Sequence, residues 1–306
     1  MTTQEPDEIL RRLELTITRR LDGMLQGNYR GLVPGHGTEP GETRLYLPGD
    51  DVRWIDWNVT ARMQVPHLRE TIAERELETW LLVDLSPSQD FGTANCTKRD
   101  LALAATAAAG FLSLRSHNRL GAVLMTGEGL VAMPARGGRA HVRAVLHRAI
   151  AAPRGDGGGP TDLVSGIRQL AAPTHRRGLA VVISDFLSPS NWERPLQMVS
   201  ARHEVLAIEV LDPRELSLPD VGTLVVTDTE TGRQREVETN RAEVRQRYAQ
   251  AAHAQREDIA AKLRRSRADH LVLRTDRDWL LDLVRFVALR RYRIDHLRRP
   301  APAAAR

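Results

Sequence analysis

The chain has 306 residues, of which 42% are hydrophobic and 27% are charged, and its formal net charge is +5. These values exclude a fibrous or wholly disordered protein and are typical of a globular chain with one large α/β domain or two small ones. All but two of the 44 basic residues are arginine. We attribute that bias to a GC-rich coding sequence, so it is not evidence of phosphate binding.

The cellular compartment is predicted from cysteine use and hydropathy. A single cysteine, Cys96, has no partner for an internal disulfide, which favours a reducing compartment. The first residues lack the basic start and apolar run of a signal peptide. The most apolar segment, residues 101–114, is too short to cross a bilayer. We therefore expect a cytoplasmic protein with no membrane span.

The N-terminal part, residues 1–75, is expected to pack on the core that follows it. Apolar residues recur at helical spacing between residues 7 and 27, which predicts one amphipathic helix. A glycine-rich loop follows, and then short β pieces and irregular structure that include Trp54 and Trp57. We expect these two tryptophans to pack the segment against the sheet, and the alternative is that they form a patch facing a partner.

From Thr79 onward, strand and helix patterns alternate along the chain. Strands are predicted at residues 80–86, 119–127, 129–135, 178–187, 203–212 and 270–276. Helices are predicted at residues 98–116, 139–152, 161–172, 191–202, 241–267 and 276–291. The alternation predicts an α/β domain over residues 76–292, built on a doubly wound, mainly parallel sheet with helices on both faces.

Two pieces fall outside this alternation. A Thr-Gly turn between two strand-like runs predicts an inserted β-hairpin near residues 222–239. The last residues, 293–306, are expected to form a basic, flexible tail.

The stretch TWLLVDLSPSQDFGT carries polar oxygen atoms at the end of a buried strand. Asp84, Ser86 and Ser88 come together there, where open parallel sheets bind ligands. No G-x-G-x-x-G or Walker A pattern follows, which disfavours a nucleotide site of those kinds. Thr161 in a later glycine-rich loop and Asp185 at the end of another strand are further oxygen donors. Such a donor set suits a hard divalent cation.

The order of these residues resembles the metal-ion-dependent adhesion site of von Willebrand factor A domains, which have a Rossmann-like sheet. Those domains have a D-x-S-x-S turn, then a threonine, then an aspartate after a later strand. The preceding segments YLPGDDVRWIDWNVTAR and ERELETWLLVDLSPSQDFG are similar to the signature of the bacterial DUF58 family, whose core is similar to such a domain. The likeness covers roughly residues 40–230. Gln89 stands where many relatives have methionine, and it is not expected to bind the metal.

The resemblance implies a binding module that is not an enzyme. Its metal ligands would be Asp84, Ser86, Ser88, Thr161 and Asp185, holding Mg²⁺ or else Mn²⁺ or Ca²⁺. In such domains a carboxylate of a protein partner completes the coordination of the cation. DUF58 proteins are also often encoded with MoxR-type AAA+ ATPases, which implies a partner of that kind in the assembly or maturation of other complexes.

Two alternatives remain open at the level of sequence. A Mg²⁺-dependent hydrolase or phosphatase of the aspartyl-phosphate type needs a second acid two residues after the first, and Ser86 stands there. The serines also lack the G-x-S-x-G flanks of a hydrolase, and the histidines lack metal-binding spacing. A nucleic-acid-binding protein is suggested by six arginines between Arg285 and Arg299, although a solvated helix end and tail is the favoured explanation because no nucleic-acid motif accompanies them.

Overall fold

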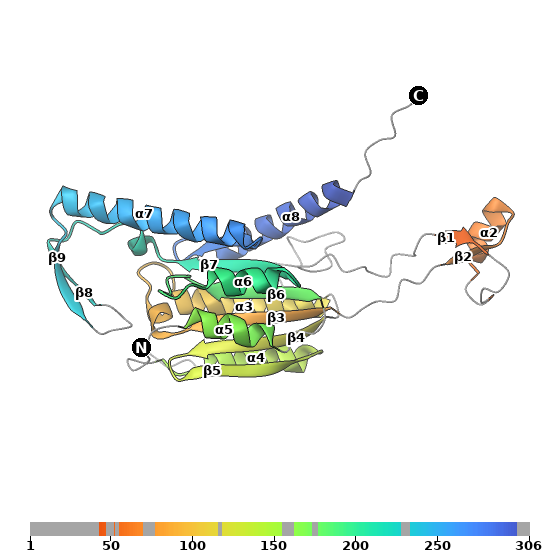
Figure 1. Ribbon diagram of the computed structural model, residues 1–306, viewed down its shortest axis with the longest axis horizontal. Coiled ribbons are helices and arrows are strands. Elements are labelled where there is room, and N and C mark those ends of the chain that lie inside the picture. The colour runs from red at the N-terminus through yellow and green to blue at the C-terminus, as the bar shows by residue number, and fades with distance from the viewer. Residues whose placement is uncertain are drawn as a thin grey trace, which may run out of the picture.

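The main body of the protein is a six-stranded sheet with helices on both faces (Figure 1). The computed structural model describes residues 43–46, 52, 55–69, 77–115, 118–154, 162–172, 177–227 and 233–298. The strands follow the order β10-β7-β6-β3-β4-β5, and β5 is antiparallel to β4 whereas the other pairs are parallel. These strands are β3 (Glu78–Leu85), β4 (Arg119–Thr126), β5 (Gly129–Arg136), β6 (Gly178–Ser184), β7 (Glu204–Leu211) and β10 (Asp269–Arg274). The predicted doubly wound, mainly parallel sheet is confirmed.

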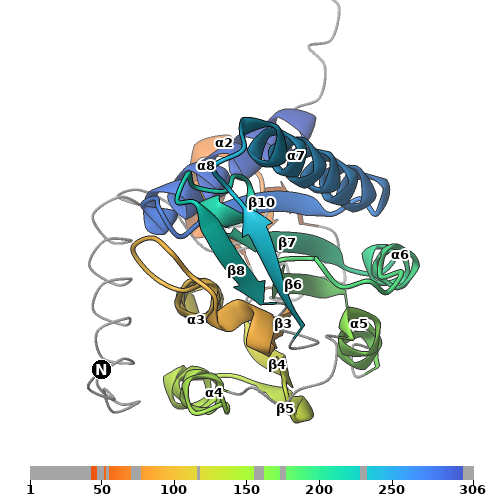
Figure 2. The same cartoon turned by 90° about the vertical axis from the view of Figure 1, so that its left-hand side faces the viewer.

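Central strand β3 is apolar on both sides because helices cover both faces of the sheet. Its residues alternate between two cores, with Leu81 and Val83 in one and Trp80 and Leu82 in the other. The helices of the first face are α3 (Lys98–Arg115), α4 (Arg139–Ile150) and α8 (Trp279–Arg298). Those of the second face are α5 (Leu163–Ala171), α6 (Glu193–Ser200) and α7 (Ala242–Arg265). Figure 2 shows the two sets on opposite sides of the strands.

The switch in strand order lies between β3 and β6. The chain first builds β3, β4 and β5 toward one edge, then returns to place β6, β7 and β10 on the other side of β3. The register pairs Val83 with Ile183, so Asp84 and Ser184 come next on adjacent strands. In open α/β sheets the carboxyl ends of strands at such a switch form the usual ligand crevice.

The predicted hairpin is present as a separate two-stranded sheet. It consists of β8 (Thr223–Thr227) and β9 (Gln234–Glu238), paired antiparallel. Both views place it beyond the carboxyl ends of the central strands (Figures 1 and 2). Buried Thr239 fastens its base, because the side-chain hydroxyl and the backbone N–H of Thr239 both donate to the carbonyl of Gly222 at 2.7 Å.

The N-terminal segment contains the short β pieces that the sequence predicts, together with one short helix. Strands β1 (Thr43–Leu45) and β2 (His67–Arg69) pair with each other, and helix α2 (Trp57–Met63), capped by Asp56, packs beside them. This small unit lies apart from the main sheet, at the end opposite the hairpin (Figure 1). The predicted packing of Trp57 on the sheet is wrong, since its side chain is 70% exposed. Trp54 and the predicted helix at residues 7–27 lie outside the described residues.

The last helix is longer than predicted. Helix α8 continues to Arg298, past the expected end of the domain at residue 292, and residues 299–306 lie outside the described part. None of the helices in the described ranges has both the length and the apolar character needed to cross a membrane.

Candidate metal centre

Asp84 is buried at the carboxyl end of β3 and is held by the turn that follows it. It is 1% exposed, and its Oδ1 accepts hydrogen bonds from the Ser86 hydroxyl at 2.6 Å and the Ser86 N–H at 3.1 Å. Pro87 then starts a short 3-10 helix, η2 (Pro87–Asp90). That turn brings the Ser88 hydroxyl to 3.1 Å from the Ser86 hydroxyl. Asp84, Ser86 and Ser88 therefore form one cluster of oxygen atoms, as the sequence predicts.

Two further side chains complete the surroundings of Asp84. The hydroxyl of Ser184, the last residue of β6, donates to Asp84 Oδ2 at 2.7 Å. Gln89 is fully buried, and its Nε2 lies 3.4 Å from both Asp84 Oδ2 and Ser88 Oγ. Its Oε1 has no hydrogen-bond partner within the described residues. The sequence analysis missed Ser184, because its role depends on the register between β3 and β6.

The charge of Asp84 is not compensated by any basic side chain in the part of the chain that the structure describes. Burial raises the pKa of Asp84 to about 6, and the nearby charge of Asp185 acts in the same direction. The hydrogen bonds from Ser86 and Ser184 lower the pKa but do not outweigh the burial. A buried carboxylate with only neutral donors is a group whose ionised form a bound cation would stabilise.

Asp185 lies at the same end of the sheet, but its carboxylate has different partners. It follows β6 and is 3% exposed, its Oδ2 lies 2.8 Å from Lys98 Nζ, and its Oδ1 accepts the N–H of Leu187 at 3.0 Å. Burial alone would raise the pKa of Asp185. The charge and hydrogen bond of Lys98, the Leu187 N–H and the charge of Arg256 outweigh burial and hold the pKa below its ordinary value. Asp185 is therefore already paired with an internal cation.

The pairing of Asp185 belongs to a larger buried network. Lys98 Nζ also contacts Glu215 Oε1 at 2.6 Å, and Glu215 Oε2 lies 3.3 Å from Arg256 Nη2. Arg256, on α7, further donates to the backbone carbonyl of Asp185 at 3.0 Å and to Glu209 Oε1 at 2.9 Å. Burial lowers the pKa of Lys98, but the two acids outweigh it and the pKa is raised. Lys98 is thus charged.

Arg99 connects the Asp84 turn to the end of α4. Its guanidinium, with the residue 1% exposed, donates to the carbonyl of Leu85 and to Asp90 on one side. On the other side it donates to the carbonyls of Ala152 and Pro153 at 2.8 and 3.2 Å. The remaining predicted ligand, Thr161, lies outside the described residues. The first described residue after it, Asp162, caps α5 by accepting from the N–H of Ser165.

The Asp84 turn fits a divalent cation, and Asp185 fits less well. Asp84, Ser86 and Ser88 offer oxygen atoms of the kind that Mg²⁺ and Ca²⁺ prefer, and the unpaired Oε1 of Gln89 is a further polar atom in the same turn. The Asp185 carboxylate already pairs with the Lys98 ammonium at 2.8 Å, so a direct metal bond would compete with an internal cation, and Asp185 fits a position reached through water better.

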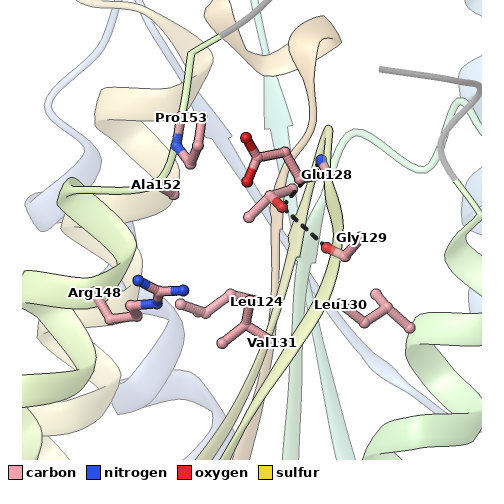
Figure 3. A pocket seen from close by; sticks show the side chains of 9 residues that line it. Leu124, Glu128, Gly129, Leu130, Val131, Arg148, Ala152 and Pro153 are labelled. Carbon is pink, nitrogen blue, oxygen red and sulfur yellow. Dashed lines mark hydrogen bonds between the residues drawn. The ribbon is translucent and has the colours of Figure 1, made fainter. Parts of the chain in front are cut away.

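A separate small pocket lies where β4 turns into β5 (Figure 3). Its volume is about 130 Å³, and its walls include Leu124, Glu128, Arg148 and Pro153. None of the predicted metal ligands in the described residues lines it. The pocket is therefore distinct from the Asp84 cluster.

The fold and this cluster define an α/β protein with a buried cluster of oxygen atoms at the switch point of its sheet. The family model described as "Protein of unknown function DUF58" matches residues 42–258, and this chain belongs to that family. It is similar to uncharacterized protein Rv1480 of Mycobacterium tuberculosis and uncharacterized protein Mb1516 of Mycobacterium bovis. Each is 56% identical over 282 residues, which cover 92% of this chain and 89% of the relative.

Similar solved structures include the conserved hypothetical protein BatB from Bacteroides thetaiotaomicron, at 12% identity and a TM-score of 0.46 over 71% of this chain and 99% of that one. They also include the SpRpn10 VWA domain, at 13% identity and a TM-score of 0.38 over 69% of this chain and 94% of that domain.

Proposed function

We propose that this protein is a non-catalytic interaction module that binds Mg²⁺ through Asp84, Ser86 and Ser88. An Asp or Glu of a protein partner completes the coordination of the Mg²⁺. The observation that carries the proposal is the state of Asp84. It is a buried carboxylate at the switch point whose partners in the described residues are hydroxyl, amide and N–H donors alone. A carboxylate of this kind favours binding of a divalent cation. The cation keeps positive charge, so it can also bind a carboxylate of a partner.

The residues of the turn have separate roles in this proposal. Ser184 and the Ser86 N–H orient the carboxylate of Asp84, each from a fixed backbone position. Ser88 is the least buried of the three predicted ligands of the turn, so the cluster opens to the outside on its side. A bound cation would supply positive charge and a coordination position for the partner's carboxylate.

The contacts of the two serines support a binding role over a catalytic one. In the described residues Ser86 contacts Asp84 and Ser88, and Ser88 contacts Ser86 and Gln89. No histidine or lysine base lies against either hydroxyl among these residues, and an activated serine nucleophile needs such a base. Resemblance to DUF58 proteins suggests a MoxR-type AAA+ ATPase as the partner, in the cytoplasm, acting on the assembly or maturation of another complex.

The test is capture of partners from a lysate of the native host. The full chain and its Asp84→Asn variant serve as baits, each with Mg²⁺ and with EDTA. Asp258→Asn, an exposed acid on α7 that pairs with Lys262, is the matched control. We expect an ATPase among the proteins captured by the unmodified chain and by the control. That capture should be lost in Asp84→Asn and in EDTA. Capture of the same proteins under all conditions would show that the metal-bridged mechanism is wrong.

A further inference from the structure

Lys98 places a positive charge inside the candidate metal centre. It is the first residue of α3, and its side chain is 2% exposed. Its ammonium lies 2.8 Å from Asp185 Oδ2 and 2.6 Å from Glu215 Oε1. Lysine is almost never fully buried unless it is paired, and here two acids supply the pairing, one directly after β6 and one in the 3-10 helix Pro213–Glu215 after β7.

The position of Lys98 runs against two general preferences. The first turn of a helix favours acids, since backbone N–H groups give it a partial positive charge, yet α3 begins with two buried basic residues. The chain also uses arginine at nearly every basic position, with lysine at 98 and 262 alone. An ammonium is a compact point charge, whereas a guanidinium is a planar fork. The position beside Asp185 thus holds the basic group that most resembles a small inorganic cation.

We propose that Lys98 is an internal cation that neutralises Asp185, leaves Asp84 as the uncompensated carboxylate among the described residues of the site, and thereby sets the affinity of the site for divalent cations. This inference builds on the proposed cation site at Asp84, but it assigns a new residue to it. Lys98 is a positioning residue, because it acts on the cation through Asp185 and by its own charge.

The contacts of Arg256 determine which acid loses its basic partner when Lys98 is removed. Arg256 pairs with the carboxylate of Glu215, so Glu215 keeps a basic partner when Lys98 is removed. Arg256 donates to the backbone carbonyl of Asp185, and its charge also acts on the Asp185 carboxylate, but among the described contacts it makes no hydrogen bond to that carboxylate. Removal of the ammonium therefore frees the Asp185 carboxylate and takes away a positive charge. Both changes favour a divalent cation, because charge count among the ligands tunes cation affinity.

The experiment is a Mn²⁺ titration of the full chain, with free Mn²⁺ followed by electron paramagnetic resonance. Lys98→Met keeps the length of the side chain and removes its charge. We expect its dissociation constant for Mn²⁺ to be about tenfold lower than that of the unmodified chain. Lys98→Met with Asp185→Asn should lose this gain. Lys262→Met is the matched control, because it removes the same charge from a partly exposed site on α7 that pairs with Asp258, and its affinity should equal that of the unmodified chain.

Folding is checked by circular dichroism for every variant. If Lys98→Met does not fold, the titration uses Lys98→Met with Glu215→Gln, which removes one of the two acids that Lys98 holds, and the same tenfold gain is expected. An unchanged or weaker affinity in a folded Lys98 variant overturns the inference.

The outcomes also separate this inference from the proposed function. If the unmodified chain binds Mn²⁺ through Asp84 and loss of Lys98 has no effect, the cation site stands and the role of Lys98 is wrong. If only the Lys98 variant binds, the role of Lys98 stands and the metal-bridged function of the natural chain is wrong. If neither binds, both are wrong.

Discussion

At the scale of single residues, three buried aspartates at the carboxyl end of the sheet differ because of their partners. Asp84 has neutral donors, Asp185 has Lys98, and Asp212 has the hydroxyls of Thr93 and Thr275 with two backbone N–H groups. Only for Asp84 is the pKa raised. Aspartate is thus a candidate cation ligand at position 84, whereas at positions 185 and 212 it makes ion pairs or hydrogen bonds within the fold.

Asp212 gives a prediction about pH. Burial raises its pKa, but hydrogen bonds from Thr93, Arg214 and Thr275 outweigh burial and lower it. A depressed pKa means that the ionised form stabilises the fold above the pKa of the unfolded chain, and that this stability is lost as the pH falls through the folded pKa. We expect Asp212→Asn to lose about 2 kcal/mol of unfolding free energy near neutral pH. The difference from the unmodified chain should shrink below about pH 4.

Urea unfolding at a series of pH values measures this difference. Asp276→Asn is the control, because Asp276 is a partly exposed acid paired with Arg274 and should cost less than about 1 kcal/mol. A loss in Asp212→Asn that stays constant down to acid pH would contradict the assigned hydrogen bonds.

Arg99 gives a second prediction at this scale. Its guanidinium joins Leu85 and Asp90 to Ala152 and Pro153, so its removal takes a hydrogen-bond donor from the buried carbonyls of Leu85 and Ala152. We expect Arg99→Met to lower the unfolding free energy by about 3 kcal/mol. Arg241→Met, from an exposed pair with Glu238, should lower it by less than about 1 kcal/mol. Equal losses in chemical denaturation of the two variants would show that Arg99 does not fasten the Asp84 turn.

At the scale of elements, the central strands pack so closely that one position has no room for a side chain. A Cβ on Gly121 of β4 would lie 2.6 Å from ring atoms of Trp80 on β3, which is 4% exposed. Overpacking of a buried core costs about 1–3 kcal/mol. This exceeds the gain of up to about 1 kcal/mol expected from replacing a flexible glycine.

We therefore expect Gly121→Ala to destabilise the protein by about 2 kcal/mol, measured by thermal unfolding. Gly137→Ala is the control, because nothing lies within 4 Å of a Cβ at that position, and it should change stability by less than about 0.5 kcal/mol. A neutral Gly121→Ala variant would mean that Trp80 can move aside.

At the scale of the whole molecule, one arginine of the basic C-terminal cluster is used inside the fold. In α8, Arg290 is 8% exposed and pairs with Asp269 and Glu204, so it ties the helix to the sheet. We expect generic duplex DNA to show no electrophoretic shift with the full chain at about 150 mM salt, although weak binding at low salt would be ordinary for a basic protein. A shift that persists at the higher salt would favour the nucleic-acid alternative.

Much of this architecture is predictable because it rests on local patterns. Apolar runs such as Leu81 to Val83 indicate a strand covered on both faces, and the alanine-rich residues 101–109 indicate a buried helix. The Thr-Gly turn indicates the hairpin. Trp57 was mispredicted because an aromatic residue near a domain is expected to be buried, whereas α2 packs on β2 by other contacts.

From the sequence by itself came the α/β class, the order of the elements, and the grouping of Asp84, Ser86 and Ser88 in one turn, because each depends on residues close together in the chain. The tertiary structure alone decided that Ser184 contacts Asp84 and that Lys98 holds Asp185. These pairings join residues 100 and 87 positions apart, and they depend on strand register and helix docking. Long-range packing sets both, and no local pattern of residue types encodes it.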